Sequence, residues 1–182
     1  PDFVAGMRKL ARRDLDAQAL IDLRDRAVTP DYAGAFEWLG YADVPVERLI
    51  ELREHGVTGE FVAELKALGY TPSLDELIEL RDHGITTDMV AKLRAAGYTR
   101  LPAAQMIALR DHGADGDYAV RMHAASATPF PVEALIAMRD HGVSPEYVSS
   151  VVSVLGARLS AEEIIALRDH GIGADAIERA QR

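Results

Sequence analysis

The sequence predicts an all-α fold of the α-solenoid class, a right-handed superhelix of stacked two-helix hairpins. The first observation behind this prediction is a Leu-Arg anchor (Met-Arg once) that recurs at intervals of 29, 28, 29, 29 and 29 residues. The second is that apolar residues follow helical spacing in two short segments of each interval, with turn residues between them. Such short helices are marginal alone and gain stability by stacking. The anchors are Leu23, Leu52, Leu80, Leu109, Met138 and Leu167.

The repeats extend over residues 1–182 without a linker or a change in composition, which predicts one array. Residues 1–4 align with residues 30–33, so the chain opens on a second helix that has no first helix before it. It closes on residues 174–182, a second helix without the usual glycine stop. We therefore expect an array truncated at both ends, with surface there that another repeat or domain would cover. The start at Pro1 without a visible signal peptide is typical of a processed or excised segment.

The first helix of each repeat is predicted from the unit that follows Ser73. Apolar residues lie at helical spacing from Leu74 to Leu80, and Ser73 with Glu76 forms the pattern of a capping box. Ser160 repeats this start. In three other repeats proline occupies the position that aligns with this serine, and proline suits the first helical turn. These prolines are Pro45, Pro102 and Pro131.

The first helix is predicted to end at a His-Gly pair. Glycine adopts the left-handed conformation beyond a helix end without strain, and the apolar residue after it packs back on the anchor. Histidine at the C-cap suits the negative end of the helix dipole. The predicted C-caps are His55, Gly56, His83, Gly84, His112, Gly113, His141, Gly142, His170 and Gly171.

The second helix is predicted to begin at a capping residue such as Thr86 and to end at a Gly-Tyr pair such as Gly97-Tyr98. In the repeat that starts at Leu109, Ser126-Ala127 replaces that pair. We expect a local change in turn geometry at that position.

An aspartate beside a histidine in Arg-Asp-His-Gly raises the question of catalysis. Adjacent residues on a helix do not face each other, and equivalent histidines of stacked hairpins lie at least one helix-packing distance, about 8–10 Å, apart. A metal ion needs ligands at about 2 Å, so neighbouring histidines are not expected to share one. We interpret the motif as a helix end and predict no catalytic residue, no metal site and no cofactor.

An arginine follows every anchor, and an acidic residue follows every arginine. Our hypothesis is a ladder in which each arginine bridges to the acidic residue or a helix-end carbonyl of the next repeat, for which a planar guanidinium is suited. The alternative is a row of arginines displayed to an anionic partner. The ladder residues are Arg53, Arg81, Arg110, Arg139 and Arg168 with Asp82, Asp111, Asp140 and Asp169, while Arg24, Asp25 and Glu54 occupy the same columns.

Columns that change between repeats are the candidate partner-binding positions. Their charge changes from acidic to basic along the second helices, which indicates either a partner footprint or neutral drift on a solvated face. Trp38, the only tryptophan, either fills space near the end of the array or is an exposed anchor for a partner. We expect His123 to be solvated. The candidates are Trp38, Glu64, Lys66, Lys92, Arg94, Arg121 and His123.

The recurring pattern LIxLRDHGVxPEYVxxLxxxGY resembles a short bacterial helix-turn-helix repeat of about 29 residues. Residues 80–85, 97–98 and 144–148 carry the resemblance. Such repeats occur in uncharacterised bacterial proteins and beside membrane metallopeptidase domains of the BlaR/MecR antibiotic-sensor type. The resemblance implies a sensing or interaction module outside the cytoplasm. It implies no peptidase activity, because the zinc motif His-Glu-x-x-His is absent.

Composition narrows the function classes. The net charge is −9 and the basic residues are scattered, which argues against a nucleic-acid partner. No apolar run reaches the roughly 20 residues that cross a bilayer, and the lack of cysteine excludes disulfides while leaving cytoplasmic and extracytoplasmic locations open. The sequence therefore predicts a non-enzymatic scaffold that binds a protein or peptide along its concave face. A sensory module of a larger membrane-associated protein, a structural spacer, a nucleic-acid-binding repeat and an enzyme site grafted on the array are the alternatives, and the oligomeric state is open.

Overall fold

The computed structural model describes residues 3–10, 15–126, 129–156 and 159–180, and every regular element in these ranges is an α-helix. This confirms the all-α prediction. The helices are α1 (Phe3–Lys9), α2 (Ala17–Asp25), α3 (Pro30–Trp38), α4 (Val46–Glu54), α5 (Gly59–Ala67), α6 (Leu74–Asp82), α7 (Thr87–Ala95), α8 (Ala103–Asp111), α9 (Gly116–Ser126), α10 (Val132–Asp140), α11 (Pro145–Leu155), α12 (Ala161–Asp169) and α13 (Ala174–Ala180).

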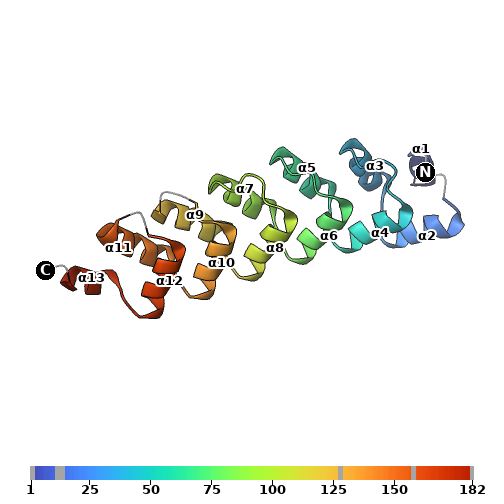
Figure 1. Cartoon of the computed structure of the whole chain (residues 1–182). Helices are drawn as coiled ribbons and strands as arrows, with labels where there is room; N and C mark the ends of the chain where they lie inside the picture. Colours follow the sequence, from blue (N-terminus) through green and yellow to red (C-terminus); the bar gives the residue numbers. More distant parts are fainter. Residues whose placement is uncertain (1–2, 11–14, 127–128, 157–158, 181–182) are drawn as a thin grey trace. The chain divides into compact units, whose positions relative to one another are not determined.

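The helices group into two units, Pro1–Asp82 and His83–Arg182. In the first unit, α1 packs on α3 and α3 on α5, while α2 packs on α4 and α4 on α6. Figure 1 shows these two rows, with the even-numbered helices in one and the odd-numbered helices in the other. We call the even-numbered helices A helices and the odd-numbered helices B helices.

The second unit has the same two rows. The B helices α7, α9, α11 and α13 pack in that order, and the A helices α8, α10 and α12 do the same (Figure 1). Neighbours in space are therefore consecutive repeats, which is the packing of a helical solenoid. The handedness of the superhelix stays a prediction.

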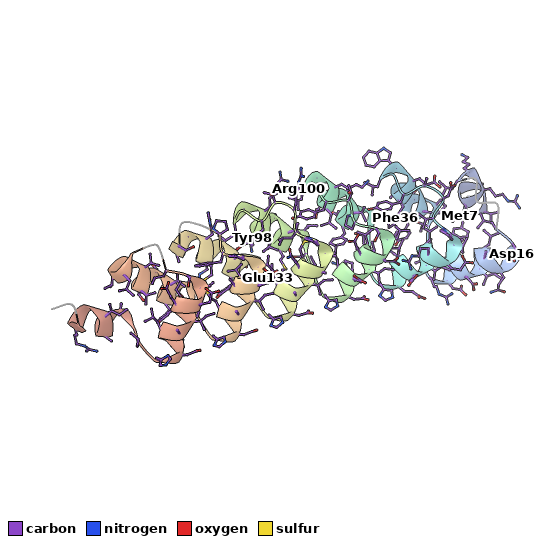
Figure 2. The ribbon with its side chains drawn as sticks, in the orientation of Figure 1. Met7, Asp16, Phe36, Tyr98, Arg100 and Glu133 are labelled. Carbon is purple, nitrogen blue, oxygen red and sulfur yellow. The ribbon has the colours of Figure 1, made fainter. Side chains whose placement is uncertain are left out.

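The core of each unit consists of columns that recur once per repeat. The anchor column is fully buried at Leu23 and Leu52 in the first unit and at Leu109 and Met138 in the second. Met7 and Phe36, labelled in Figure 2, are also fully buried in the first unit. The apolar stripes predicted from helical spacing are thus the surfaces that the helices bury against each other.

Helix starts follow the predicted capping chemistry. The Ser160 side chain accepts a hydrogen bond from the Glu163 N–H while Glu163 accepts from the Ser160 N–H, and Ser73 with Glu76 forms the same capping box. Thr86 accepts from the backbone N–H three residues later. The prolines of this column differ slightly from the prediction. They occupy the N-cap position, one residue before the first turn, and make no side-chain capping bond.

Helix ends are closed by the predicted glycine turn. Gly56 has φ +70°, and the Val57 N–H donates to the Leu52 carbonyl at 2.8 Å, the hydrogen bond of a Schellman motif. The other glycines of this column have φ between +66° and +68°. Histidine takes the C-cap of α4, α8, α10 and α12. In the first repeat Ala27 stands in the glycine column and adopts φ +54°, a strained conformation for a residue with a Cβ.

Two B helices are longer than the others. The helices α9 and α11 have 11 residues, whereas α3, α5 and α7 have nine. The position of the stop glycine is occupied by Ser126 and Leu155 in these two helices, and the helical conformation extends to that position; α11 then ends at Gly156, which has φ +91°. The turn after Ser126 lies in part outside the described residues. Within the described ranges, no helix combines the length and apolar character needed to span a membrane.

Candidate binding surface

The arginine row lies between neighbouring A helices. Arg81 Nε donates to the Gly56 carbonyl at 3.1 Å, and the guanidinium lies 5.1 Å from the centre of the Phe61 ring. Arg168 Nε donates to the Gly142 carbonyl at 3.2 Å. Arg81 and Arg168 therefore reach the glycine turn of the preceding repeat, not the next repeat as the ladder hypothesis states. Arg24, Arg53, Arg139 and Arg168 also stack on an aromatic ring of the preceding B helix.

The acidic column pairs with histidine and not with arginine. His55 Nδ1 donates to Asp82 Oδ1 at 2.6 Å, which raises the pKa of His55 because the carboxylate stabilises the imidazolium. The aspartate and histidine that are adjacent in sequence thus belong to different pairs. The same pairing joins His83 to Asp111 at 3.0 Å, His112 to Asp140 at 3.0 Å and His141 to Asp169 at 2.9 Å.

The first and last repeats show that this pairing depends on the neighbouring repeat. Arg26 replaces histidine in the first repeat, and its Nε donates to Glu54 at 2.7 Å. His170, in the last A helix, has no following A helix among the described residues. Its Nδ1 donates instead to the carbonyl of Ala166 in its own helix, at 2.8 Å.

The His-Asp pairs hold helices together at an exposed surface. Between 37% and 48% of each paired side chain is exposed, so water and salt screen the interaction strongly. In the described part of the chain, no three His, Cys, Asp or Glu side chains are grouped so that they could hold a metal ion. The pairs orient the imidazoles, but the same geometry repeats at four successive junctions, as a structural contact does.

Tyrosine hydroxyls form another set of contacts between repeats. Tyr32 donates to the Val57 carbonyl at 2.8 Å, and Tyr118 donates to the Val143 carbonyl at 2.9 Å, both in buried positions. Tyr147 makes the equivalent bond to Ile172 at the surface. These acceptors follow the glycine of the A-helix turn, so the tyrosine fixes the turn of the next repeat. The spacing of 25 residues between donor and acceptor was the signal that sequence reasoning missed.

Three of the partner-binding candidates make contacts with other residues of the B-helix rows. Lys92 Nζ lies 2.8 Å from Asp88 and 2.9 Å from Asp117, and these two hydrogen bonds raise its pKa. Arg121 pairs with Glu146 of the next B helix. Lys66 donates to a backbone carbonyl at the end of α3 and lies 5.0 Å from the centre of the Tyr41 ring.

The other candidates differ in exposure. Trp38 is 85% exposed, so the interpretation that it fills space in the stack is wrong. His123 is half-buried, and its Nδ1 is enclosed without a hydrogen-bond partner among the described residues, so the expected solvated side chain is also wrong. Glu64 and Arg94 are exposed on α5 and α7.

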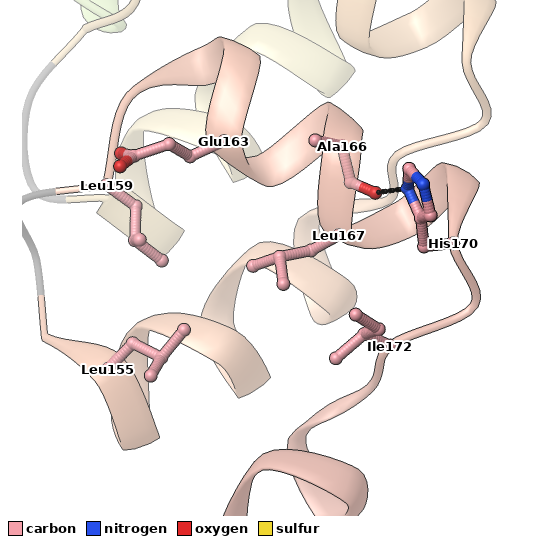
Figure 3. A pocket seen from close by; sticks show the side chains of 7 residues that line it. All are labelled: Leu155, Leu159, Glu163, Ala166, Leu167, His170 and Ile172. Atoms are coloured by element: carbon pink, nitrogen blue, oxygen red, sulfur yellow. Dashed lines mark hydrogen bonds between the residues drawn. The ribbon is translucent and has the colours of Figure 1, made fainter.

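Two open hollows lie in the second unit. One, of about 550 Å³, is between α9 and α11 and is lined by Arg121, Glu146 and the hydroxyls of Ser149, Ser150 and Ser153. The other, of about 380 Å³, is largely apolar and lies beside α11 and α12 (Figure 3). Its lining residues are Leu155, Leu159, Glu163, Ala166, Leu167, His170 and Ile172.

Most residues that recur in every repeat are thus engaged in contacts between helices. What remains as candidate binding surface is the exposed side of the B helices, with Trp38 in the first unit and the hollow between α9 and α11 in the second. Comparison of the chain with protein-family models, with curated proteins and with solved structures gave no match.

Proposed function

We propose that the chain is a non-enzymatic helical-repeat scaffold that binds a protein or peptide through the exposed side of its B helices. The observation that carries this proposal is the exposure of Trp38. Its equivalents Ala67, Ala95 and Ala124 are small, so nothing in the repeat requires a large aromatic ring at this position. Tryptophan combines a large apolar surface with an N–H donor, and it is enriched among the residues that dominate binding energy at interfaces.

The hollow between α9 and α11 adds a polar surface of the kind that an extended peptide can contact. The Ser150 hydroxyl donates to the Tyr147 carbonyl, and the Ser153 hydroxyl donates to the Ser150 carbonyl. Both hydroxyl oxygens keep lone pairs that can accept hydrogen bonds from a ligand. Arg121 with Glu146 at the same hollow offers charges of both signs.

The experiment uses Trp38 as the only tryptophan fluorophore of the chain. Peptides selected from a random displayed library on the whole chain are titrated against it, and we expect a blue shift of the emission as the indole leaves water. Calorimetry with Trp38→Ala should show a loss of affinity of about tenfold or more, as for other aromatic residues that dominate binding energy. Leu155→Ala, which truncates another exposed apolar side chain, is the matched control and should bind as the wild type does.

Two results would contradict the proposal. The library yields no peptide that binds the folded chain, or the selected peptides bind Trp38→Ala with unchanged affinity. In the first case the chain behaves as a structural spacer. In the second case a surface other than that around Trp38 carries the binding.

A further inference from the structure

The second unit shows how acidic residues of neighbouring B helices are bridged by one cation. Asp88 and Asp117 lie in the first turns of α7 and α9. Lys92 Nζ lies 2.8 Å from an Asp88 carboxylate oxygen and 2.9 Å from one of Asp117. The ammonium therefore offsets the charge of two carboxylates at this junction. The next junction of the row also pairs its acid, because Arg121 binds Glu146.

The first unit has two carboxylates in the same places but lacks the bridging cation. Asp31 and Glu60 lie in the first turns of α3 and α5, and both are exposed. The repeat aligns them with the two aspartates of the second unit, and it aligns Ala35 with Lys92. In the described part of the chain, neither Asp31 nor Glu60 takes part in an ion pair. This surface therefore carries two negative charges that no basic side chain among those residues binds.

The helices approach each other in the same way at the two junctions. A Cβ placed on Gly59 of α5 would lie 2.8 Å from the Ala35 Cβ. A Cβ placed on Gly116 of α9 would lie 2.7 Å from the Lys92 Cβ. Both glycines thus permit the same close approach of one B helix to the next. A lysine at position 35 would therefore carry its ammonium to the two carboxylates of the first unit.

Trp38 lies beside these carboxylates on the same side of α3. It follows Ala35 by three residues, and residues three apart are neighbours on the surface of a helix. Because the indole is 85% exposed, its face is open to a cation or to the aliphatic stem of a basic side chain. Lys66 is the basic residue of α3 and α5, and its ammonium is directed elsewhere, to the Leu39 carbonyl.

We propose that the partner places a lysine or arginine side chain between Asp31 and Glu60, at the position that Lys92 fills in the second unit. We call the site the α3–α5 surface and define it by Asp31, Ala35, Trp38 and Glu60. Charge complementarity decides for a basic peptide segment, because an acidic segment would be repelled and a purely apolar one would leave both carboxylates without a cation. This inference rests on the proposed function and adds the chemistry of its partner.

The test uses peptides selected on the whole chain from a random displayed library, with affinities measured by calorimetry. We expect the peptides that require Trp38 to contain a lysine or arginine. Its replacement by norleucine, which keeps an aliphatic stem and removes the charge, should lower the affinity about fivefold. The affinity should also fall as salt is raised from about 50 mM to about 0.5 M, because salt screens exposed charges.

Ala35→Lys supplies the missing cation from within the chain. The variant copies the arrangement at Lys92, so the fold is retained, which circular dichroism verifies. We expect it to lower the affinity of the selected peptides about fivefold or more, because its ammonium pairs with both carboxylates and repels the cation of the peptide. Ala35→Gln has a polar side chain without charge and should bind within about twofold of the wild type.

Glu60→Gln removes one of the two carboxylates and should lower the affinity about two- to fivefold. Glu79→Gln is the matched control. It makes the same change of charge at an exposed position of α6, in the row of A helices, and should bind as the wild type does. The pair of variants therefore separates a local contact from the effect of net charge.

Selected peptides that require Trp38 but no basic residue overturn the proposal, and so does unchanged affinity for Ala35→Lys. Equal losses in Ala35→Lys and Ala35→Gln overturn it too, because bulk and not charge would then block the surface. Equal losses in Glu60→Gln and Glu79→Gln overturn it by assigning the effect to net charge. A library that yields no peptide contradicts the proposed function itself, and this inference with it.

Discussion

The hydroxyl of Tyr118 provides the sharpest test of how the repeats are held together. The residue is 5% exposed, and its hydroxyl donates to the Val143 carbonyl at 2.9 Å while Arg139 lies 5.2 Å from the ring centre. Burial raises the pKa of Tyr118 to about 12, so the phenol keeps its proton and donates at neutral pH. The perturbation is Tyr118→Phe, which removes only the hydroxyl.

The expected loss of stability follows from the Val143 carbonyl, which remains in place without its donor. A buried carbonyl without a donor costs about 1–2 kcal/mol, since neither protein nor water replaces the lost bond. Ring stacking with Arg139 is retained in the variant, so the change isolates the hydrogen bond. Tyr147→Phe is the matched control. Its hydroxyl makes the equivalent bond at 2.6 Å, but at an exposed position where water can take the place of the hydroxyl, so we expect a loss below about 0.5 kcal/mol.

The assay is urea unfolding followed by far-ultraviolet circular dichroism. With an m-value of about 2–3 kcal/mol/M, Tyr118→Phe should lower the midpoint by about 0.5 M, and Tyr147→Phe by less than half of that. Equal midpoints for the two variants would refute the reasoning, because burial of the acceptor would then not determine the cost. A wild-type midpoint for Tyr118→Phe would show that this hydroxyl does not hold the next turn.

Three further predictions concern the other recurring contacts. Ala27→Gly should raise the free energy of unfolding by about 0.5–1 kcal/mol in urea titrations, because glycine removes the left-handed strain and loses part of that gain to chain entropy. The pKa of His55 is raised in the folded state. The stabilisation that its pairing with Asp82 provides is therefore complete below the unfolded pKa of about 6.5 and is lost as the pH rises through the folded pKa. The stability of the wild type relative to Asp82→Asn should therefore fall from about pH 5.5 to about pH 8, and NMR titration should show a lower His55 pKa in that variant; a pH-independent difference would contradict this. Arg81→Lys should lower the free energy of unfolding by about 0.5–1 kcal/mol more than Arg110→Lys does, and thermal unfolding should show a correspondingly lower midpoint. The reason is that Arg81 stacks on an aromatic ring, whereas the equivalent position for Arg110 holds a methionine; equal midpoints would count against ring stacking.

The helices and their ends could be predicted from sequence because their causes are local. A serine and a glutamate three residues apart, or a glycine followed by an apolar residue, act within one turn of chain. Ser73 with Glu76 and the turn at Gly56 therefore have the predicted form. The replacement of glycine by Ser126 was also informative, since α9 extends to that position whereas α7 ends two residues before its glycine.

The contacts between repeats could not be predicted in the same way. The pairing of His55 with Asp82 depends on how far one A helix is displaced along the next, and spacing of anchors does not fix that displacement. The direction of Arg81 toward the preceding glycine turn has the same cause. The sequence left two alternatives open for Trp38 and gave the wrong expectation for His123, because exposure depends on which side of a helix the neighbouring hairpin covers.

The pairing of histidine with the acid of the next repeat explains why Arg-Asp-His-Gly recurs as a block in four of the repeats. Asp111 serves His83 of the preceding repeat, while His112, its neighbour in sequence, serves Asp140 of the following one. Each copy of the motif therefore carries both halves of a junction, one directed backward and one directed forward. A change of one half alone leaves a partner in the adjacent repeat without its complement. The first junction is consistent with this constraint, because arginine replaces histidine at position 26 and the longer glutamate replaces aspartate at position 54, and the two side chains still meet.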